Sequence, residues 1–199
     1  MNVVFDVGNV LIRWRPERAV AHVYPDRDEA LDYLEAVGFA DWNYTQDGGR
    51  PFAEGIAALE AAHPGQSGPL STYVARFGET IAEPISGTWD LLDRLKARGH
   101  RLFAITNFAA ETWPVALQVH PRLGGVFEDV VVSGFEKLLK PEPAIFERLL
   151  ARNGVQAQDC LFIDDSPANV TGAQAVGMAA HLFTTPEALE ADLIARALL

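Results

Sequence analysis

Short runs of mostly apolar residues recur along the chain, and each run is followed by polar residues. The runs cover residues 3–5, 102–105, 130–132, 161–163 and 179–183. They contain three to five apolar residues without alternation, which is typical of strands that are buried on both faces of a parallel sheet. The pattern therefore predicts five buried strands.

Helical periodicity fills the segments between the later runs. Three helices are predicted there, over residues 89–99, 143–150 and 166–177. In the last of them, Ser166 fits the N-cap position, Pro167 fits the first turn and Gly177 fits the end. Strands that alternate with helices in this way predict an α/β fold, a Rossmann-like open parallel sheet with right-handed crossovers.

Residues 16–85 break this alternation. They contain no convincing buried strand, and a polar and aromatic stretch covers residues 41–50. Helix-like patterns occupy residues 28–37, 52–62 and 70–81. We interpret this block as a helical cap inserted after the first strand, which leaves residues 1–15 and 86–199 as the Rossmann-like core.

Composition and charge narrow the range of partners. Of the 199 residues, 49% are hydrophobic and 22% are charged, which is typical of a soluble globular protein. Sixteen basic residues against 27 acidic ones give a net charge of −11. Such a surface repels nucleic acid and anionic membranes, so we expect neither as a partner. A local site can still bind a small phosphorylated molecule.

Two further features bear on the compartment. Cys160 is the single cysteine, so no disulfide can form within the chain and a reducing compartment is expected. The chain opens directly on the first apolar run, and no apolar segment approaches the roughly 20 residues that a membrane helix needs. We therefore expect a cytoplasmic protein.

Polar residues that could take part in catalysis or in ligand binding follow the predicted strands. These residues are Asp6, Thr106, Asn107, Asp164 and Asp165, and Lys140 follows the strand at residues 130–132. In an open α/β sheet, ligands bind outside the carboxyl ends of the strands. Neighbouring carboxylates need a cation to neutralise them, and a small number of hard oxygen ligands suits Mg²⁺. Such a site could hold a phosphoryl group while Asp6 attacks phosphorus to give an aspartyl-phosphate, which water then hydrolyses.

Four ordered segments resemble the haloacid dehalogenase-like (HAD) hydrolase superfamily. They are residues 5–11 (FDVGNVL), 105–107 (ITN), 140–146 (KPEPAIF) and 162–169 (FIDDSPAN). Together they span nearly the whole chain, and each lies at the end of a predicted strand. The resemblance implies an open parallel sheet with a helical cap between the first and second motifs.

The resemblance also implies roles in phosphoryl transfer. Asp6 would be the nucleophile. Thr106 and the Asn107 amide would bind the phosphoryl oxygens, and Gly8 and Asn9 would lie in the same phosphate-binding loop.

The remaining roles concern charge and metal binding. By the resemblance, Lys140 would neutralise the nucleophile and the phosphate. Asp6 and the main-chain carbonyl of Gly8 would bind Mg²⁺. Asp165 would bind the ion directly, and Asp164 would act through a bound water or share that role.

The first motif departs from the pattern of most phosphatases of this family. They carry a second aspartate two residues after the nucleophile, which protonates the leaving group, whereas this chain has Gly8 followed by Asn9. General acid–base catalysis is typically worth ~10²–10⁴-fold. An acidic leaving group, such as an anomeric sugar hydroxyl, needs protonation less, and the Gly-Asn-Val form resembles a branch that includes a sugar-1-phosphate phosphatase. We therefore expect a Mg²⁺-dependent phosphatase acting on a small phosphorylated metabolite, with a sugar phosphate favoured.

Two functions of other classes are alternatives to a phosphatase. A metal-independent 2-haloacid dehalogenase also uses an aspartate nucleophile, but dehalogenases of this family lack the pair Asp164–Asp165 and usually have tyrosine at the place of Gly8. A catalytically weak phosphate-binding or regulatory module would explain the absent acid, but would not require Asp6.

Aromatic and polar residues near the motifs could line the substrate pocket or simply pack the interior. In the cap these are Trp42, Tyr44, Asp47 and Arg50, and after the second motif they are Phe108 and Trp113.

Overall fold

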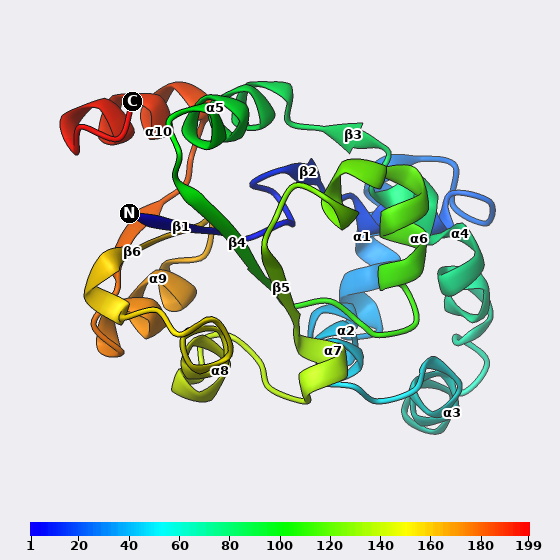
Figure 1. The fold of residues 1–199 in the computed structure, drawn as a ribbon. Helices are drawn as coiled ribbons and strands as arrows, with labels where there is room; N and C mark the ends of the chain where they lie inside the picture. The colour runs from blue at the N-terminus through cyan, green and yellow to red at the C-terminus, as the bar shows by residue number, and fades with distance from the viewer.

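A five-stranded parallel sheet forms the centre of the computed structural model, which describes all 199 residues (Figure 1). Its strands are β1 (Asn2–Phe5), β4 (Arg101–Thr106), β5 (Asp129–Val132), β6 (Cys160–Asp164) and β7 (Ala179–Leu182). The strand order is β5-β4-β1-β6-β7. The predicted α/β fold and all five predicted strands are confirmed, although the last ends at Leu182 rather than at Phe183.

The register of the sheet brings three strand ends to one place. Strand β1 lies at the centre and pairs with β4 on one side and with β6 on the other. Phe5, its last residue, is opposite both Ala104 and Ile163. Because all three strands run in the same direction, the residues that follow them meet at the carboxyl edge of the sheet.

Helices cover both faces of this sheet. On one face, α8 (Pro143–Asn153) packs against β4 and β5, and α9 (Pro167–Ala175) packs against β6 and β7. On the other face, α5 (Ser86–Ala97) packs against β4 and against α10 (Pro186–Ala195) (Figure 1). Successive side chains on a strand point to opposite faces, so strands covered on both faces need apolar residues at every position.

The three helices predicted in this region are present as α5, α8 and α9. Ser166 occupies the N-cap of α9 in an extended conformation, but its side chain accepts no capping hydrogen bond. Its main-chain N–H instead donates to Asp164 Oδ1 at 2.8 Å. Four helical elements of the core have no counterpart in the predictions: α6 (Trp113–Val119), α7 (Ser133–Glu136) and the 3-10 turns η3 (Pro121–Gly124) and η4 (Ala157–Asp159). Helix α10 was not predicted either.

A helical segment separates two short antiparallel strands, β2 (Ile12–Arg13) and β3 (Glu83–Pro84). Their pairing holds both ends of this segment side by side. Its elements are the turns η1 (Pro16–Val20) and η2 (Gly68–Thr72) and the helices α1 (Arg27–Ala36), α2 (Phe39–Asp47), α3 (Phe52–Ala62) and α4 (Tyr73–Thr80). It therefore consists of helices, as the sequence pattern predicts, with a two-residue strand at its end.

Helix α2 occupies the polar and aromatic stretch for which no element was predicted. Phe39, Trp42 and Gln46 are its buried residues and fall three and four positions apart, so they share one face. Phe39 and Trp42 join an aromatic cluster with residues of the next helices, which are Phe52, Tyr73 and Phe77. The stretch folds as a helix because this aromatic cluster buries one of its faces.

The helical segment lies beyond the carboxyl ends of β1 and β4 (Figure 1). One cluster of 39 buried hydrophobic residues runs from the sheet into this segment without interruption. A division of the chain into a core and a separate cap therefore stays a prediction. No helix combines the length and apolar character needed to cross a membrane.

Candidate active site

A cavity of about 270 Å³ opens at the carboxyl edge of the sheet, between the core and the helical segment. Nearly all the site residues predicted from sequence line it: Asp6, Gly8, Asn9, Thr106, Asn107, Lys140 and Asp165. Asp164 is fully buried and does not reach the cavity surface. The cavity thus brings together residues from four separate parts of the chain.

The turn after β1 places Asp6 at the base of the cavity. The Asp6 N–H donates to Ile163 O at 2.8 Å, which continues the sheet by one residue. Asn9 has a left-handed φ of 53°, a conformation that asparagine tolerates better than most residues. Its Oδ1 accepts the main-chain N–H of Trp14 at 3.1 Å. Asn9 therefore shapes the turn, and its carboxamide oxygen already accepts a hydrogen bond within the chain.

Lys140 is buried between two carboxylates. Its Nζ lies 2.8 Å from Asp6 Oδ1 and 2.7 Å from Asp164 Oδ2, and only 1% of its side chain is exposed. Burial disfavours the ammonium ion, but the two carboxylates outweigh this effect and raise the pKa of Lys140 above its ordinary value. The residue is therefore a fixed positive charge beside Asp6.

The main chain at Lys140 is clamped from two sides. Asn107 Nδ2 donates to Lys140 O at 3.0 Å, and the Lys140 N–H donates back to Asn107 Oδ1 at 2.9 Å. The Tyr44 hydroxyl of α2 also donates to Lys140 O, at 3.3 Å. The side chain of Asn107 is therefore occupied, whereas its main-chain N–H has no partner among the hydrogen bonds of the chain. Of the two Asn107 amides, the main-chain group is the one free for a ligand.

The two adjacent aspartates after β6 have different surroundings. Asp164 accepts from Lys140 Nζ, from the Ser166 N–H and, with both oxygens, from Asn169 Nδ2 at 3.0 and 3.1 Å. Asp165 is the more exposed of the two, but partial desolvation of its carboxyl group and the Asp164 charge still raise its pKa. Asp165 therefore has free acceptor capacity, whereas the oxygens of Asp164 are already occupied by donors of the chain.

The carboxylates of Asp6, Asp164 and Asp165 suit a divalent cation. One oxygen from each lies within 4.8 Å of the others. Asp6 Oδ1 is buried and makes no hydrogen bond, because the nearby Lys140 ammonium is not aligned for one. Burial raises the pKa of Asp6 to about 7, with Lys140 opposing this rise and the charge of Asp164 adding to it. A buried acceptor without a donor, in a cluster of like charges, fits a hard cation such as Mg²⁺.

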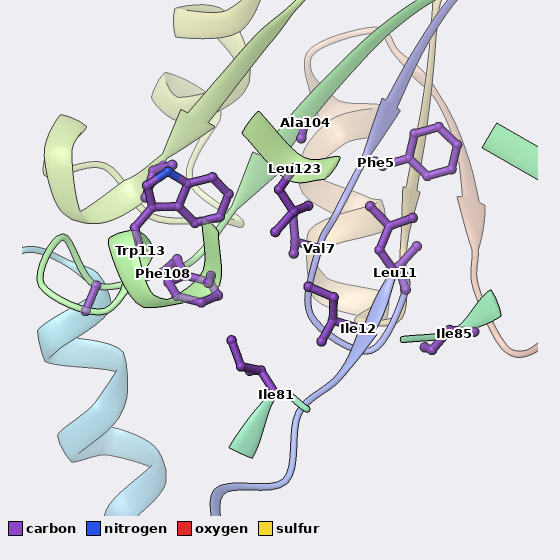
Figure 2. Close-up of a cluster of buried hydrophobic side chains, with 14 of the residues drawn as sticks. Phe5, Val7, Leu11, Ile12, Ile81, Ile85, Ala104, Phe108, Trp113 and Leu123 are labelled. Carbon is purple, nitrogen blue, oxygen red and sulfur yellow. The ribbon is translucent and has the colours of Figure 1, made fainter. Parts of the chain in front are cut away.

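Apolar side chains also line the cavity. Val7, Ile12, Ile81 and Phe108 gather around the same space (Figure 2), and Phe77 and Trp14 also line it. Asn43 and Asp47 of α2 add polar groups to the cavity lining. The helical segment therefore contributes directly to the cavity.

The structure separates the aromatic and polar candidates into two groups. Asp47 and Phe108 line the cavity. Trp42 donates from Nε1 to Gly55 O at 2.7 Å inside the aromatic cluster, and Trp113 packs against Phe108 with ring centroids 5.3 Å apart. Arg50 donates from Nε to Gln46 Oε1 within the helical segment and does not line the cavity.

Sequence reasoning missed Asn43, Thr112 and Asn169 as cavity residues. Asn169 is the last residue of the fourth motif, and its place one helical turn after Asp165 was a usable signal. Asn43 and Thr112 carried no local signal, because only the packing of α2 and of the loop before α6 brings them to the cavity.

Comparison with known protein families agrees with this geometry. A family model described as haloacid dehalogenase-like hydrolase matches residues 1–177. A sesquiterpene phosphatase of Aspergillus oryzae is 27% identical over 180 residues, which cover 88% of this chain and 85% of that protein. A glyceraldehyde 3-phosphate phosphatase of Pyrococcus abyssi is 34% identical over 96 residues, or 47% of this chain and 40% of that protein.

Solved structures share the fold. A HAD family enzyme of Bacteroides thetaiotaomicron, crystallised as a magnesium complex, superposes with a TM-score of 0.69 at 22% identity and covers 92% of this chain and 93% of its own. A predicted HAD-like hydrolase of Porphyromonas gingivalis has a TM-score of 0.71 at 24% identity, covering 99% and 97% of the two chains.

Proposed function

Because this chain belongs to the haloacid dehalogenase-like hydrolase family, we propose that it is a Mg²⁺-dependent phosphatase that hydrolyses a small phosphorylated metabolite through an aspartyl-phosphate on Asp6. The observation that carries the proposal is the position of Asp6. Its carboxylate lies at the base of the cavity, with Lys140 Nζ 2.8 Å from one oxygen and Asp165 in the same acidic cluster.

Different residues of the chain have separate roles in phosphoryl transfer. An oxygen of Asp6 attacks phosphorus, and Lys140 offsets the charge of both the carboxylate and the phosphoryl group. The Thr106 hydroxyl and the free Asn107 N–H bind phosphoryl oxygens, next to the turn of Gly8 and Asn9. Water then hydrolyses the aspartyl-phosphate and restores Asp6.

Asp6, Asp165 and the Gly8 carbonyl would hold Mg²⁺, and Asp164 would contribute chiefly by holding Lys140 and the turn at Ser166. The ion supplies positive charge to the phosphoryl oxygens during transfer. Without it, three neighbouring carboxylates would repel an anionic substrate, so the proposal requires the metal.

The substrate that we favour is a sugar phosphate, since a cavity of about 270 Å³ holds a small molecule and Asn43 and Asp47 add polar groups to its wall. The apolar wall formed by Trp14, Phe77 and Phe108 supports a second candidate, the monophosphate of a hydrophobic alcohol. We place this activity in the cytoplasm, since the buried Cys160 has no disulfide partner and needs no oxidising compartment.

A panel of phosphomonoesters tests the proposal. It contains glucose 1-phosphate, glucose 6-phosphate, glyceraldehyde 3-phosphate and farnesyl phosphate, each with Mg²⁺ or with EDTA. We expect phosphate release from at least one of them only with Mg²⁺, and a fall to below about one thousandth of the rate in Asp6→Asn, because the nucleophile is lost. Asp41→Asn is the matched control, since this aspartate lies exposed on α2 outside the cavity.

Three outcomes would contradict the proposal. Chloride release from 2-chloropropionate without metal would identify a dehalogenase. Binding of inorganic phosphate without turnover of any ester would identify a binding module. Equal turnover by Asp6→Asn and the wild type would exclude the aspartyl-phosphate.

A further inference from the structure

Where most phosphatases of the family carry their acid–base aspartate, this chain has Gly8. The place is open, because a Cβ added to Gly8 meets no atom within 4 Å. Four ionisable residues line the cavity: Asp6, Asp47, Lys140 and Asp165. Asp47 is therefore the one carboxylate of the cavity wall that does not belong to the acidic cluster of Asp6.

Asp47 is held in place by both parts of the molecule. Its Oδ2 accepts Asn43 Nδ2 at 2.9 Å. Its main-chain carbonyl accepts the Ser133 hydroxyl at 2.6 Å, and Ser133 Oγ accepts the N–H of Phe108 at 2.8 Å. These bonds join the end of α2 to the loop after β4 and to α7, so the carboxylate has a fixed position in the wall.

The chain after Asp47 fits closely against the core. A Cβ on Gly49, which has a φ of 99°, would lie 3.0 Å from Gly134 O. A Cβ on Gly48 would lie 3.1 Å from a methyl group of Leu139. This pair of glycines allows the end of α2 to approach the segment that leads to Lys140. It thereby brings Asp47 to the same cavity as the nucleophile.

The surroundings of Asp47 suit proton transfer. Burial raises its pKa to about 7, and the negative charge of Asp6 acts in the same direction. The Ala109 N–H, the charge of Lys140 and the Asn43 amide oppose this rise. A carboxyl group that changes its protonation near neutral pH can act both as an acid and as a base.

We propose that Asp47 is the general acid and base of this active site and replaces the carboxylate that the first motif lacks. The proposal rests on the phosphatase function proposed above. In the first step, an oxygen of Asp6 bonds to phosphorus while the bond from phosphorus to the leaving oxygen breaks. That oxygen keeps the bonding electrons and takes the proton of the Asp47 carboxyl group.

In the second step, the oxygen of a water molecule bonds to phosphorus while the bond from phosphorus to Asp6 breaks. The Asp47 carboxylate takes a proton from this water, so inorganic phosphate leaves and both aspartates return to their starting states. With this acid present, the enzyme is not restricted to acidic leaving groups, and primary alkyl phosphates become substrates.

The test compares two substrates in Asp47→Asn. Glucose 6-phosphate releases an alkoxide that needs a proton, whereas 4-nitrophenyl phosphate releases a phenolate that does not. We expect kcat/KM to fall ~10²–10⁴-fold on glucose 6-phosphate and less than about tenfold on 4-nitrophenyl phosphate. Because hydrolysis of the aspartyl-phosphate still needs the base, kcat on 4-nitrophenyl phosphate should fall, with an initial burst of nitrophenolate. Asp41→Asn should behave as wild type on both substrates.

A second variant distinguishes the loss of the acid from a merely structural effect of the Asp47 substitution. Gly8→Asp, made in the Asp47→Asn protein, returns a carboxylate to the open position beside Asp6, and we expect at least about tenfold recovery of kcat/KM on glucose 6-phosphate. An equal loss on both substrates in Asp47→Asn, or a loss below about threefold on glucose 6-phosphate, would overturn the proposal. Absence of turnover in the wild-type protein would instead refute the phosphatase function itself.

Discussion

Lys140 shows how the fold holds a buried charge in place. An ion of this kind carries a large desolvation penalty, which its two carboxylate partners offset only with good geometry. Here Nζ donates a hydrogen bond of 2.7 Å to Asp164, Asp6 adds its charge at 2.8 Å, and Asn107 holds the main chain of the same residue. The charge therefore has a fixed place before any substrate arrives.

Asp47 is the opposite case, because burial leaves its carboxylate without an adjacent cation. Burial raises its pKa from an ordinary value of 3.8 to about 7 in the folded state. The folded protein therefore binds this proton more tightly than the unfolded chain does. Below about pH 4 the group is neutral in both states and does not affect the free energy of unfolding. As the pH rises from about 4 to about 7, the buried charge lowers that free energy by an increasing amount.

We expect Asp47→Asn to be more stable than the wild type at pH 8, by about 1–4 kcal/mol, since each pKa unit corresponds to about 1.4 kcal/mol. The two proteins should be equally stable near pH 4. Urea unfolding in EDTA at pH 4.5, 6 and 8 measures the difference, with Asp41→Asn as the control. A difference that stays constant over this range would show that the Asp47 charge carries no penalty.

Among the helices and strands, α9 packs closely against the segment after β5, and a glycine allows this contact. A Cβ on Gly172 of α9 would clash with the main-chain oxygen of Pro141 and would lie 3.2 Å from the Phe146 ring. Pro141 follows Lys140 directly. The close approach of this helix therefore helps to set the position of Lys140.

Gly172→Ala should lower both stability and activity. Alanine favours a helix over glycine by about 1 kcal/mol. Overpacking against Pro141 costs about 1–3 kcal/mol and dominates because main-chain atoms cannot move aside easily. We expect the melting temperature to fall by at least about 3 °C, since 1 kcal/mol corresponds to roughly 2–4 °C at this size.

Gly68→Ala provides the matched control for this helix contact. A Cβ at Gly68 meets no atom within 4 Å, and its φ is not positive. We expect its melting temperature and phosphatase rate to stay close to those of the wild type. If Gly172→Ala also left both unchanged, the contact of α9 with Pro141 would not position Lys140.

For the molecule as a whole, part of the net charge of −11 lies in the acidic cluster at the carboxyl edge of the sheet. A ligand that binds only the folded state stabilises it by mass action, by about 2.7 kcal/mol at a concentration one hundred times Kd. We therefore expect saturating Mg²⁺ to raise the melting temperature by about 5–10 °C at constant ionic strength.

Asp165→Asn should remove most of this Mg²⁺-dependent shift, because Asp165 is the late aspartate with free acceptor capacity, whereas Asp41→Asn should keep it. Thermal unfolding monitored by circular dichroism, with and without the ion, measures both shifts. An equal shift in Asp165→Asn and in the wild type would mean that Mg²⁺ acts on the surface charge and not at the acidic cluster.

Local patterns in the chain are sufficient to predict the sheet and the motif residues at its edge. Apolar runs without alternation are stable only when both faces of a strand are covered, which predicted a parallel sheet before any contact was known. Parallel strands end at one edge, so Asp6, Thr106 and Asp165 had to meet there. These conclusions depend on local patterns and on the shared direction of the strands.

Which polar groups remain free at that edge depends on contacts between distant segments of the chain. Tyr44 bonds to Lys140 across 96 positions, and Ser133 bonds to Asp47 across 86. Contacts over such separations leave no periodic pattern in the chain, and α2 itself has a buried face only because the aromatic cluster covers it. The place of Asp47 in the cavity therefore follows from packing between distant segments, which no local pattern encodes.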